Sequence, residues 1–417
     1  MARRIGFFIP EFPGQTHIFL WREHAALSEL GIEAEFVSTA RPPAAIASHA
    51  WADAARNRTE YLLPFGFSDA LSAVFEILKA GPRNIAKSMA TVAAAEVKSP
   101  FGRLRIFAAL LVAGKLVRLA HRGRWSHIHV HSCAEAANVA MFASLLSGIP
   151  YSLTLHGPTL EGYGPNQPLK WKNAAFATVI SKRLFDDVDA KLNGSKPAHV
   201  AIAPMGVDLT QIRRIRPYVP WKPGEPCRIF TCGRLNPVKG HDFLLETVEM
   251  LGERGFDARL QIAGEDERGG TGYRKNLEAL VVEKRLTGCV ELLGAISENQ
   301  VRQALEEAHV FALASLNEGI SVAIMEAMAM EMPVIVTDVG GNSELIDNGV
   351  DAILVTPERP EEMADAITEV LRNRELSARL CRASRAKISA KFHHRISAHA
   401  VASLLEQRVT AAPNTSK

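Results

Sequence analysis

The chain has 417 residues and nearly balanced charge, with 48 Lys and Arg against 45 Asp and Glu. This length favours two or three domains over a single core. A composition of 47% hydrophobic and 22% charged residues excludes a disordered chain, a collagen-like repeat and a disulfide scaffold. The net charge of +3 argues against a dedicated nucleic-acid-binding protein. The five cysteines form no CxxC pair, so we expect reduced thiols and a cytoplasmic location.

The first half of the chain alternates apolar runs with stretches long enough to form helices. Strands are predicted at Ile5–Ile9, 32–38, 127–131, 151–157, 177–184 and 199–209, with a helix at 137–148. Because continuous apolar strands separated by helices have both faces covered, this half is predicted to contain a parallel sheet. The first apolar run is too short for a signal peptide, and no stretch reaches the ~18 uncharged apolar residues of a membrane span.

A proline-rich segment separates two α/β units. Residues 213–226 contain four prolines and no helical periodicity, which is typical of a linker. After it, strands are predicted at 227–235, 258–266, 289–296, 310–315, 333–341 and 352–357, alternating with helices at 242–255, 273–286, 297–308 and from Gly319. We therefore predict an N-terminal Rossmann-like domain (1–212), a linker (213–226), a second Rossmann-like domain (227–385) and a helix with a tail (386–417). The two sheets are expected to face each other across a cleft, and the sequence leaves open whether the last helix crosses back to the first domain.

Residues 101–124 form a basic segment with two open interpretations. Apolar residues alternate here with six cations, Arg103, Arg105, Lys115, Arg118, Arg122 and Arg124. We favour an ordinary domain helix with a solvated basic face. The alternative is a helix that lies on an anionic membrane surface.

Two cations follow the first strand of the second unit. Arg234 and Lys239 lie in the loop that begins at Gly233, at the carboxyl end of this strand. An arginine offers a bidentate fork to phosphate, and a lysine offers a point charge. The loop is therefore a candidate diphosphate site, although a basic loop that caps a helix would have the same sequence.

A second element places two carboxylates around a predicted helix start. Glu318 precedes the helix, and the amides of Gly319, Ile320 and Ser321 are expected to be free donors for an anion. Glu326 follows eight residues later, ~12 Å along a helix axis. Since its neighbours are almost all apolar, this carboxylate needs a partner, which favours a functional role.

A Gly-Gly turn and a histidine-rich strand are weaker signals. Gly340–Gly341 permits a close backbone approach to a ligand, but ordinary turns use glycine in the same way. His127, His129 and His131 alternate along one strand, so all three face one side, as in a metal site. Because no carboxylate lies at ligand spacing, we interpret them as polar residues of the strand and expect no metal.

The motifs together resemble a known family. The order GRL…KG, EG…E and PV…GG…E over 225–360 resembles the donor domain of retaining glycosyltransferases of family 4, which have the GT-B architecture. In the first half, FPGQTHIFLWREHAALSELG, IPYSLTLHG, VISKRL and PMGVDL are similar to segments of the colanic-acid and exopolysaccharide transferases of that family. The resemblance implies that α/β fold with two Rossmann-like domains.

The resemblance also implies roles for single residues. It assigns Arg234 and Lys239 to the donor diphosphate, Glu318 to the transferred sugar and Glu326 to the ribose hydroxyls. The amides of Gly319–Ser321 and the turn Gly340–Gly341 would lie at the phosphate or sugar. The implied nucleobase loop is Leu293, Gly294, Ala295 and Ile296, and His156 would stabilise the reacting sugar.

The function that the resemblance implies is hexosyl transfer (class EC 2.4) from a nucleotide-diphosphate sugar, with UDP- and GDP-sugars as the candidates. The acceptor would be a saccharide or a polyprenyl-linked saccharide in exopolysaccharide or other cell-surface glycan synthesis, at the cytoplasmic membrane face and with no cofactor. A nucleotide-sugar epimerase of the same architecture and an inactive binding protein remain alternatives. The absence of GxGxxG and GxxxxGK[ST] argues against an oxidoreductase and a P-loop ATPase.

Overall fold

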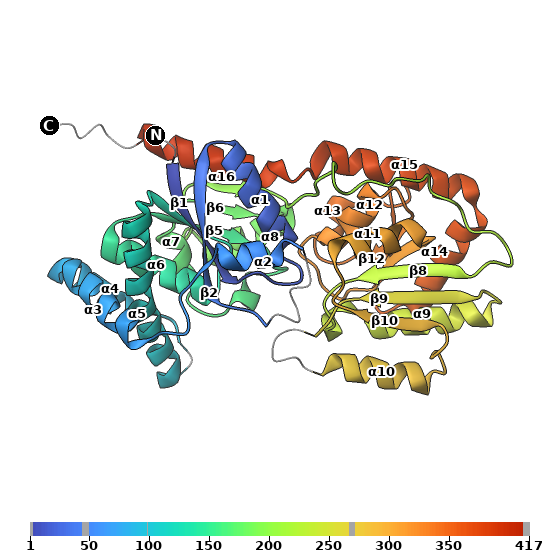
Figure 1. Cartoon of the computed structure of the whole chain (residues 1–417), viewed down its shortest axis with the longest axis horizontal. Coiled ribbons are helices and arrows are strands. Elements are labelled where there is room, and N and C mark those ends of the chain that lie inside the picture. Colours follow the sequence, from blue (N-terminus) through green and yellow to red (C-terminus); the bar gives the residue numbers. More distant parts are fainter. Residues whose placement is uncertain (1–2, 44–49, 98, 267–271, 412–417) are drawn as a thin grey trace.

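The computed structural model describes residues 3–43, 50–97, 99–266 and 272–411. Two α/β domains lie side by side, each with a parallel sheet between layers of helices (Figure 1). All five cysteines are unpaired. No helix within the described residues is both long and apolar enough to cross a membrane.

The N-terminal sheet has seven parallel strands in the order β3-β2-β1-β4-β5-β6-β7. Its strands are β1 (Arg3–Glu11), β2 (Ile32–Ala40), β3 (Glu60–Tyr61), β4 (His127–Val130), β5 (Tyr151–Leu155), β6 (Ala177–Val179) and β7 (Val200–Ile202). Five consecutive residues of β1 are buried, as expected for a strand covered on both faces. The strand predicted over 177–184 is shorter than expected because the Ser181 hydroxyl accepts a hydrogen bond from the amide of Leu184 and starts a helix there.

Helices cover both faces of this sheet (Figure 1). They are α1 (Ile18–Glu29), α2 (Ala52–Asn57), α3 (Phe67–Lys79), α4 (Gly81–Ala94), α5 (Pro100–Gly123), α6 (Glu135–Ser147), α7 (Gln167–Lys172) and α8 (Lys182–Leu192), with a 3-10 turn at Glu161–Tyr163. The predicted helix at 137–148 is confirmed in α6, which is buried on almost every side and is correspondingly apolar.

The C-terminal sheet has six parallel strands in the order β10-β9-β8-β11-β12-β13. They are β8 (Cys227–Cys232), β9 (Ala258–Ala263), β10 (Val290–Gly294), β11 (Val310–Leu313), β12 (Val334–Thr337) and β13 (Ile353–Val355). In both sheets the strand order reverses beside the first strand, between β1 and β4 and between β8 and β11. Ligands of doubly wound sheets bind at the carboxyl ends of the strands beside this reversal.

The helices of the C-terminal domain follow the predicted alternation. They are α9 (His241–Glu253), α10 (Tyr273–Glu283), α11 (Glu298–Glu307), α12 (Val322–Ala329), α13 (Asn342–Leu345), α14 (Pro360–Arg372) and α15 (Arg374–Lys391), with a 3-10 turn at Pro237–Lys239. The helix predicted from Gly319 is wrong at its start, because α12 begins only at Val322.

The last helix, α16 (Arg395–Ala411), crosses back and packs on the N-terminal domain (Figure 1). Its residues Ala398, Val401 and Leu405 are buried in one cluster with Ile5 and Phe7 of β1. The placement that the sequence left open is thereby decided. The chain passes from one domain to the other twice, after Ile202 and again after α15. The two connecting segments lie side by side and form a parallel β-bridge between Val207 and His393.

Candidate active site

Loops from the carboxyl ends of β8 and β11 meet at the strand reversal of the C-terminal sheet. Nζ of Lys239, in the turn after β8, donates to Oε1 of Glu318 at 2.5 Å. The hydroxyl of Ser315, just after β11, donates to the same oxygen at 2.7 Å. Glu318 is only 8% exposed, so it is an oriented carboxylate with a matching cation. Two of the predicted site residues are therefore in direct contact.

The loop after β12 packs against the main chain of Glu318 and Gly319. The amide of Gly341 donates to the carbonyl of Gly319 at 2.8 Å. Gly340 has φ +58°, and a Cβ added there would lie 1.7 Å from the carbonyl oxygen of Glu318. The Gly340–Gly341 turn is thus a backbone support for Glu318 and Gly319, and the Gly341 amide, which we expected to face a ligand, is already used.

Replacing Gly340 by alanine is expected to destabilise the protein by about 2–4 kcal/mol, because left-handed strain adds to overpacking against Glu318. Gly349→Ala is the matched control: Gly349 has φ +73° with nothing within 4 Å of an added Cβ, so only the strain remains. Denaturant unfolding measures both variants. An equal loss in the two would contradict the proposed support of Glu318.

The segment between Glu318 and α12 is extended rather than helical. Ser321 is the N-cap of α12 with ψ 122°, and the amides of the first turn belong to Val322 and its successors. The axial separation of ~12 Å predicted for Glu318 and Glu326 therefore does not apply, because it assumed 1.5 Å of rise for every residue. The side chain of Ile320 is 4% exposed and lies against Gly341, so only its main chain is left to contact a donor.

His156 reaches this cluster from the other domain. It follows β5, and a Cβ added at Gly319 would lie 2.6 Å from the His156 carbonyl oxygen. Tyr163 lies beside it: its hydroxyl is hydrogen-bonded to the main chain of His156 and Gly157. Burial raises the pKa of Tyr163, and the charge of Arg234 acts in the opposite direction, so Arg234 is within electrostatic reach across the cleft. The predicted catalytic histidine and the predicted sugar site therefore face each other.

Behind His156, a chain of buried polar groups leads into the N-terminal domain. Nε2 of His156 lies 3.1 Å from Nδ1 of His131, and Nε2 of His131 lies 3.5 Å from Oε1 of Glu23 on α1. Burial lowers the pKa of His156 to about 3, so its ring is neutral at pH 7. Burial likewise raises the pKa of Glu23 to about 7, opposed by a hydrogen bond from Ser397 of α16.

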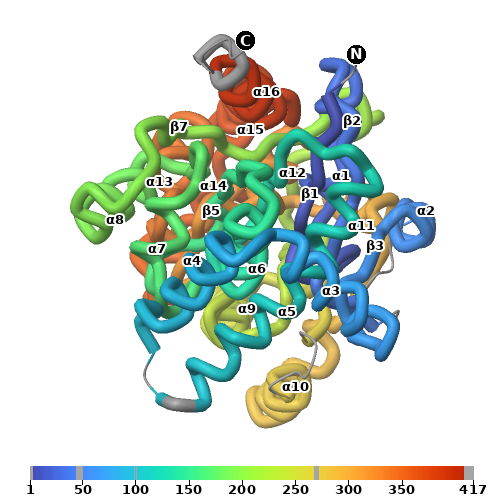
Figure 2. The backbone as a smooth tube through the Cα atoms, turned by 90° about the vertical axis from the view of Figure 1, so that its left-hand side faces the viewer, coloured from blue at the N-terminus to red at the C-terminus, as the bar shows by residue number. Residues whose placement is uncertain are grey.

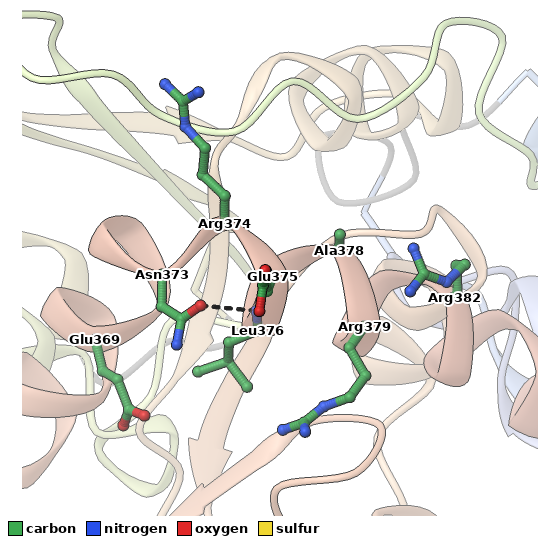
Figure 3. Close-up of a pocket in the computed structure, with 8 residues that line it drawn as sticks. All are labelled: Glu369, Asn373, Arg374, Glu375, Leu376, Ala378, Arg379 and Arg382. Atoms are coloured by element: carbon green, nitrogen blue, oxygen red, sulfur yellow. Dashed lines mark hydrogen bonds between the residues drawn. The ribbon is translucent and has the colours of Figure 1, made fainter.

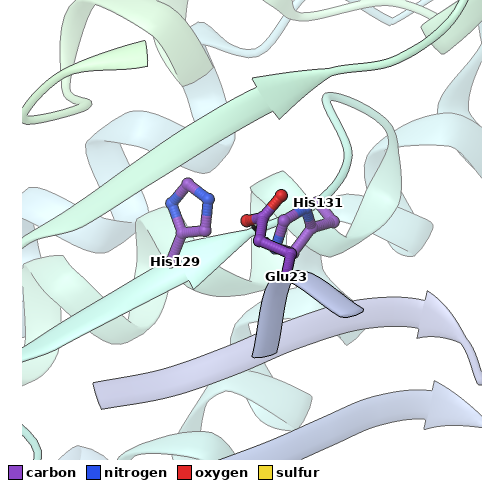
Figure 4. A group of neighbouring side chains, drawn as sticks. All are labelled: Glu23, His129 and His131. Carbon is purple, nitrogen blue, oxygen red and sulfur yellow. Dashed lines mark ion pairs between the residues drawn. The ribbon is translucent and has the colours of Figure 1, made fainter. Parts of the chain in front are cut away.

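The same region contains a group with metal-ligand chemistry, Glu23, His129 and His131 (Figure 4). Their candidate ligand atoms lie within 4.8 Å of one another. His127, His129 and His131 alternate along β4 and the residue after it, as predicted. The carboxylate of Glu23 comes from α1, so residue spacing along β4 could not reveal it. His129 already contacts the hydroxyls of Ser152 at 2.7 Å and Thr154 at 3.0 Å, so binding a cation would break one of these bonds. This donor set fits a hydrogen-bonded core better than a metal site.

The raised pKa of Glu23 predicts a pH-dependent stability. The folded-state pKa of about 7 lies above the ordinary value of 4.5, so the contribution is intact below pH 4.5 and is lost as pH rises through 7. Glu23→Gln cannot ionise, and it is expected to match the wild type at pH 4.5 and to be more stable at pH 8, by about 3 kcal/mol. Thermal unfolding at both pH values measures this, with exposed Glu283→Gln as the control. A difference that does not change with pH would contradict it.

Several polar contacts bridge the two domains around the cleft. Arg22 on α1 is 4% exposed and donates to Oε1 of Glu298 at 2.5 Å and to Oε1 of Glu326 at 3.1 Å. Glu344 accepts hydrogen bonds from the amides of Lys182 and Arg183 at the start of α8, at 2.6 and 2.8 Å. Glu326, the predicted ribose ligand, is therefore bonded to the N-terminal domain.

The segment predicted as the nucleobase loop, Leu293 to Ile296, begins in the last two residues of β10 and continues beyond the strand at the same sheet edge. A Cβ added at Gly294 would lie 3.6 Å from Oε2 of Glu265, which pairs with Arg274 at 2.7 Å. The side chain of Gln15, from the opening loop of the other domain, donates to the Glu265 carbonyl at 3.1 Å. This loop therefore lies beside a polar group that spans the cleft.

A surface pocket lies elsewhere, where α14 meets α15 (Figure 3). It is lined by residues between Glu369 and Arg382, and the Asn373 side chain in it caps α15 by accepting from the Leu376 amide at 3.0 Å. None of the predicted site residues lines it. The residues between the two domains therefore remain the candidate active site.

Sequence reasoning missed Ser315 and Glu298 of the C-terminal domain and several residues of the N-terminal domain. Gln15, Arg22 and Glu23 lie in the opening segment that carried the family resemblance, yet no spacing rule marked them individually. Tyr163 stands in a polar loop without a pattern. Their partners lie up to 304 residues away in the chain, as Arg22 and Glu326 do.

Two family patterns match most of the chain. The pattern described as "Glycosyl transferases group 1" matches residues 226–373, and "Glycosyl transferase 4-like domain" matches residues 20–217. The alpha-D-kanosaminyltransferase of Streptomyces kanamyceticus is 25% identical over 285 residues, 64% of this chain and 72% of that one. The putative colanic acid biosynthesis glycosyltransferase WcaL of Salmonella typhimurium is 30% identical over 226 residues, which are 52% of this chain and 53% of WcaL.

Solved structures share the whole architecture. HepE of Anabaena, crystallised with UDP, has a TM-score of 0.70 at 18% identity over 97% of this chain and all of that chain. The sucrose-phosphate synthase of Thermosynechococcus elongatus has a TM-score of 0.72 at 18% identity over 98% and 100%. The family patterns and this shared two-domain architecture show that the chain belongs to the glycosyltransferases of family 4 and has the GT-B fold.

Proposed function

We propose that the protein is a retaining glycosyltransferase that moves a sugar from a nucleotide-diphosphate sugar to a saccharide or polyprenyl-linked acceptor, in exopolysaccharide or other cell-surface glycan synthesis. The observation that carries this is the contact of Gly319 with His156, which brings the Lys239–Glu318 pair opposite a buried, neutral histidine. The names of the relatives support glycan synthesis. Solved relatives of the same fold with UDP and UDP-glucose support a nucleotide-sugar donor.

The proposed reaction needs charge stabilisation more than acid–base groups. As the bond between the anomeric carbon and the phosphate oxygen breaks, its electron pair stays on the phosphate, where Arg234 and Lys239 stabilise it. The acceptor oxygen bonds to the anomeric carbon on the face that the phosphate leaves, and its proton passes to the departing phosphate. No metal or cofactor takes part in this proposal.

The two remaining roles concern the sugar. Glu318, oriented by its hydrogen bond from Lys239, accepts hydrogen bonds from hydroxyls of the transferred sugar. His156 offers both its main-chain carbonyl and a neutral ring, whose Nδ1 is buried without a hydrogen-bond partner among the described residues. A sugar hydroxyl at this nitrogen would satisfy it. Glu326 would exchange its bond with Arg22 for the ribose hydroxyls when the donor enters.

A thermal-shift screen of UDP-, GDP- and ADP-sugars tests the donor, because a ligand that binds the folded state raises its stability by mass action. The best donor is then incubated with saccharide and polyprenyl-linked acceptors, and the anomeric configuration of the product is read by NMR. Retention with an acceptor is the expected result. A change of the donor sugar without any acceptor would instead indicate an epimerase, and no binding by calorimetry would indicate an inactive binding protein.

A lipid-linked acceptor would bring the enzyme to the cytoplasmic membrane face. This peripheral location is part of the proposal.

A further inference from the structure

Helix α3 turns its apolar side to solvent. Phe67, Leu71, Val74, Phe75 and Leu78 recur at the spacing of one helix face, and Phe67 is 82% and Leu78 66% exposed. A helix that packs on a soluble domain normally buries this face.

The polar side of α3 faces the protein instead. Asp69 accepts from Nζ of Lys115 on α5 at 2.8 Å, and Glu76 pairs with His121 at 3.1 Å. Ala73 packs so closely on α5 that a Cβ at Gly114 would lie 2.6 Å from its carbonyl oxygen. Polar side chains and a small residue therefore hold α3 against α5, and this packing leaves the apolar face of α3 directed to solvent.

The neighbouring helices carry further exposed apolar side chains. Met89 of α4 and Phe101, Leu104 and Phe107 in the first turns of α5 are exposed, Phe101 to 70%. Among the described residues, ten of the eighteen exposed large apolar side chains fall between 63 and 107, and the others are spread over the rest of the chain. A monomeric soluble protein rarely exposes such a concentration unless it has a binding partner.

The charge of the chain is concentrated in the same segment. Residues 63–124 contain ten Lys and Arg against three Asp and Glu, whereas the rest of the chain contains 38 against 42. Two of the three acids, Asp69 and Glu76, are occupied by contacts with α5. Lys79, Arg83 and Lys87 are exposed beside the apolar face. This end of the molecule is positive, and the remainder is slightly negative.

The three helices lie together at the end of the N-terminal domain that is far from the C-terminal domain (Figures 1 and 2). Helix α5 ends four residues before β4, at the amino edge of the sheet, and its 24 residues correspond to about 36 Å. Since β4 has four residues, or about 13 Å, the first turns of α5 extend past the carboxyl edge of the sheet.

We propose that α3, α4 and the first turns of α5 form a docking surface for an anionic lipid bilayer, with the apolar side chains inserted between the headgroups and the cations against their phosphates. Outward phenylalanine and leucine flanked by Lys and Arg complement such a surface in both polarity and charge. The inference rests on the proposed function only for the lipid-linked acceptor, because binding to vesicles does not require catalysis. The sequence alone favours a solvated basic face for residues 101–124. The proposal takes the membrane alternative instead, with α3 rather than α5 supplying most of the apolar contact.

Co-sedimentation of the full chain with vesicles tests the surface. Vesicles of phosphatidylcholine with an equal part of phosphatidylglycerol are expected to bind at least about tenfold more tightly than phosphatidylcholine alone, with loss of binding at high salt. The variant Leu71→Ser/Phe75→Ser/Leu78→Ser is expected to weaken binding at least about tenfold. Arg83→Glu/Lys87→Glu removes the preference for anionic lipid. The matched controls, Ile215→Ser/Val282→Ser and Lys275→Glu, change equally exposed residues elsewhere and keep wild-type binding.

The proposed docking surface is wrong if wild-type protein does not bind anionic vesicles, or if the triple variant binds them as tightly as wild type. A dimer that dissociates in the triple variant, together with absent vesicle binding, would identify a second copy of the chain as the occupant instead. The donor thermal shift is recorded for every variant. It should be unchanged in the triple variant, so that a failure of the surface and a failure of the proposed transferase are separate results.

Discussion

Lys239→Ala is expected to lower kcat/KM for sugar transfer by about 10²–10³, because a preorganised cation at a developing phosphate charge is worth that much. The same change leaves Glu318 with Ser315 as its partner, so donor binding weakens as well. Transfer and donor hydrolysis are measured with the donor found by thermal shift. Arg234→Lys, which keeps the charge and removes the fork, is expected to have a smaller effect in the same direction.

The matched control for this experiment is Lys275→Ala on α10, an exposed lysine outside the cleft. It should retain wild-type kinetics. Thermal unfolding of Lys239→Ala separates a loss of catalysis from a loss of fold. Unchanged transfer and hydrolysis in a folded Lys239→Ala would remove Lys239 from the active site.

Arg22→Ala is expected to open the cleft. Its guanidinium is the cation between Glu298 and Glu326, and removing one member of a buried ionic group costs about 3–5 kcal/mol when the others stay buried. Both carboxylates belong to the C-terminal domain, so opening the cleft exposes them to water and reduces this cost, which favours separation of the domains in the variant. We expect a larger radius of gyration by small-angle scattering and a donor KM that rises more than kcat falls.

Arg4→Ala provides the comparison, since it removes an ion pair with Glu33 whose two side chains are 47% and 53% exposed. Such pairs contribute about 0–1 kcal/mol, and neither scattering nor kinetics should change. If Arg22→Ala keeps the wild-type radius of gyration, the Arg22 bridge does not hold the cleft closed.

The alternation of strands and helices could be predicted from the sequence, and so could the site residues that lie close to strand ends. Apolar runs located the strands of the C-terminal sheet, and position after β8 and β11 was enough to select Lys239 and Glu318. These two are 79 residues apart, yet both loops leave the same sheet edge, so their contact follows from topology alone.

The other site residues depend on how the two domains pack against each other. Residue spacing along the chain carries no information about that packing. Arg22 and Glu23 are neighbours in α1, but one bonds to the other domain and the other lies in the core beside His131. The start of α12 was predicted too early because helix propensity cannot register that the Gly341 amide holds Gly319 in an extended loop.

Because α16 supplies part of the core around β1, the N-terminal domain is not one continuous stretch of chain. The first domain emerges from the ribosome without the helix that completes this apolar cluster, and α16 can pack there only after the whole C-terminal domain has been synthesised. A separately produced N-terminal domain would need residues 395–411 attached to it. Loss of the last helix would therefore damage the N-terminal domain while leaving the C-terminal domain intact.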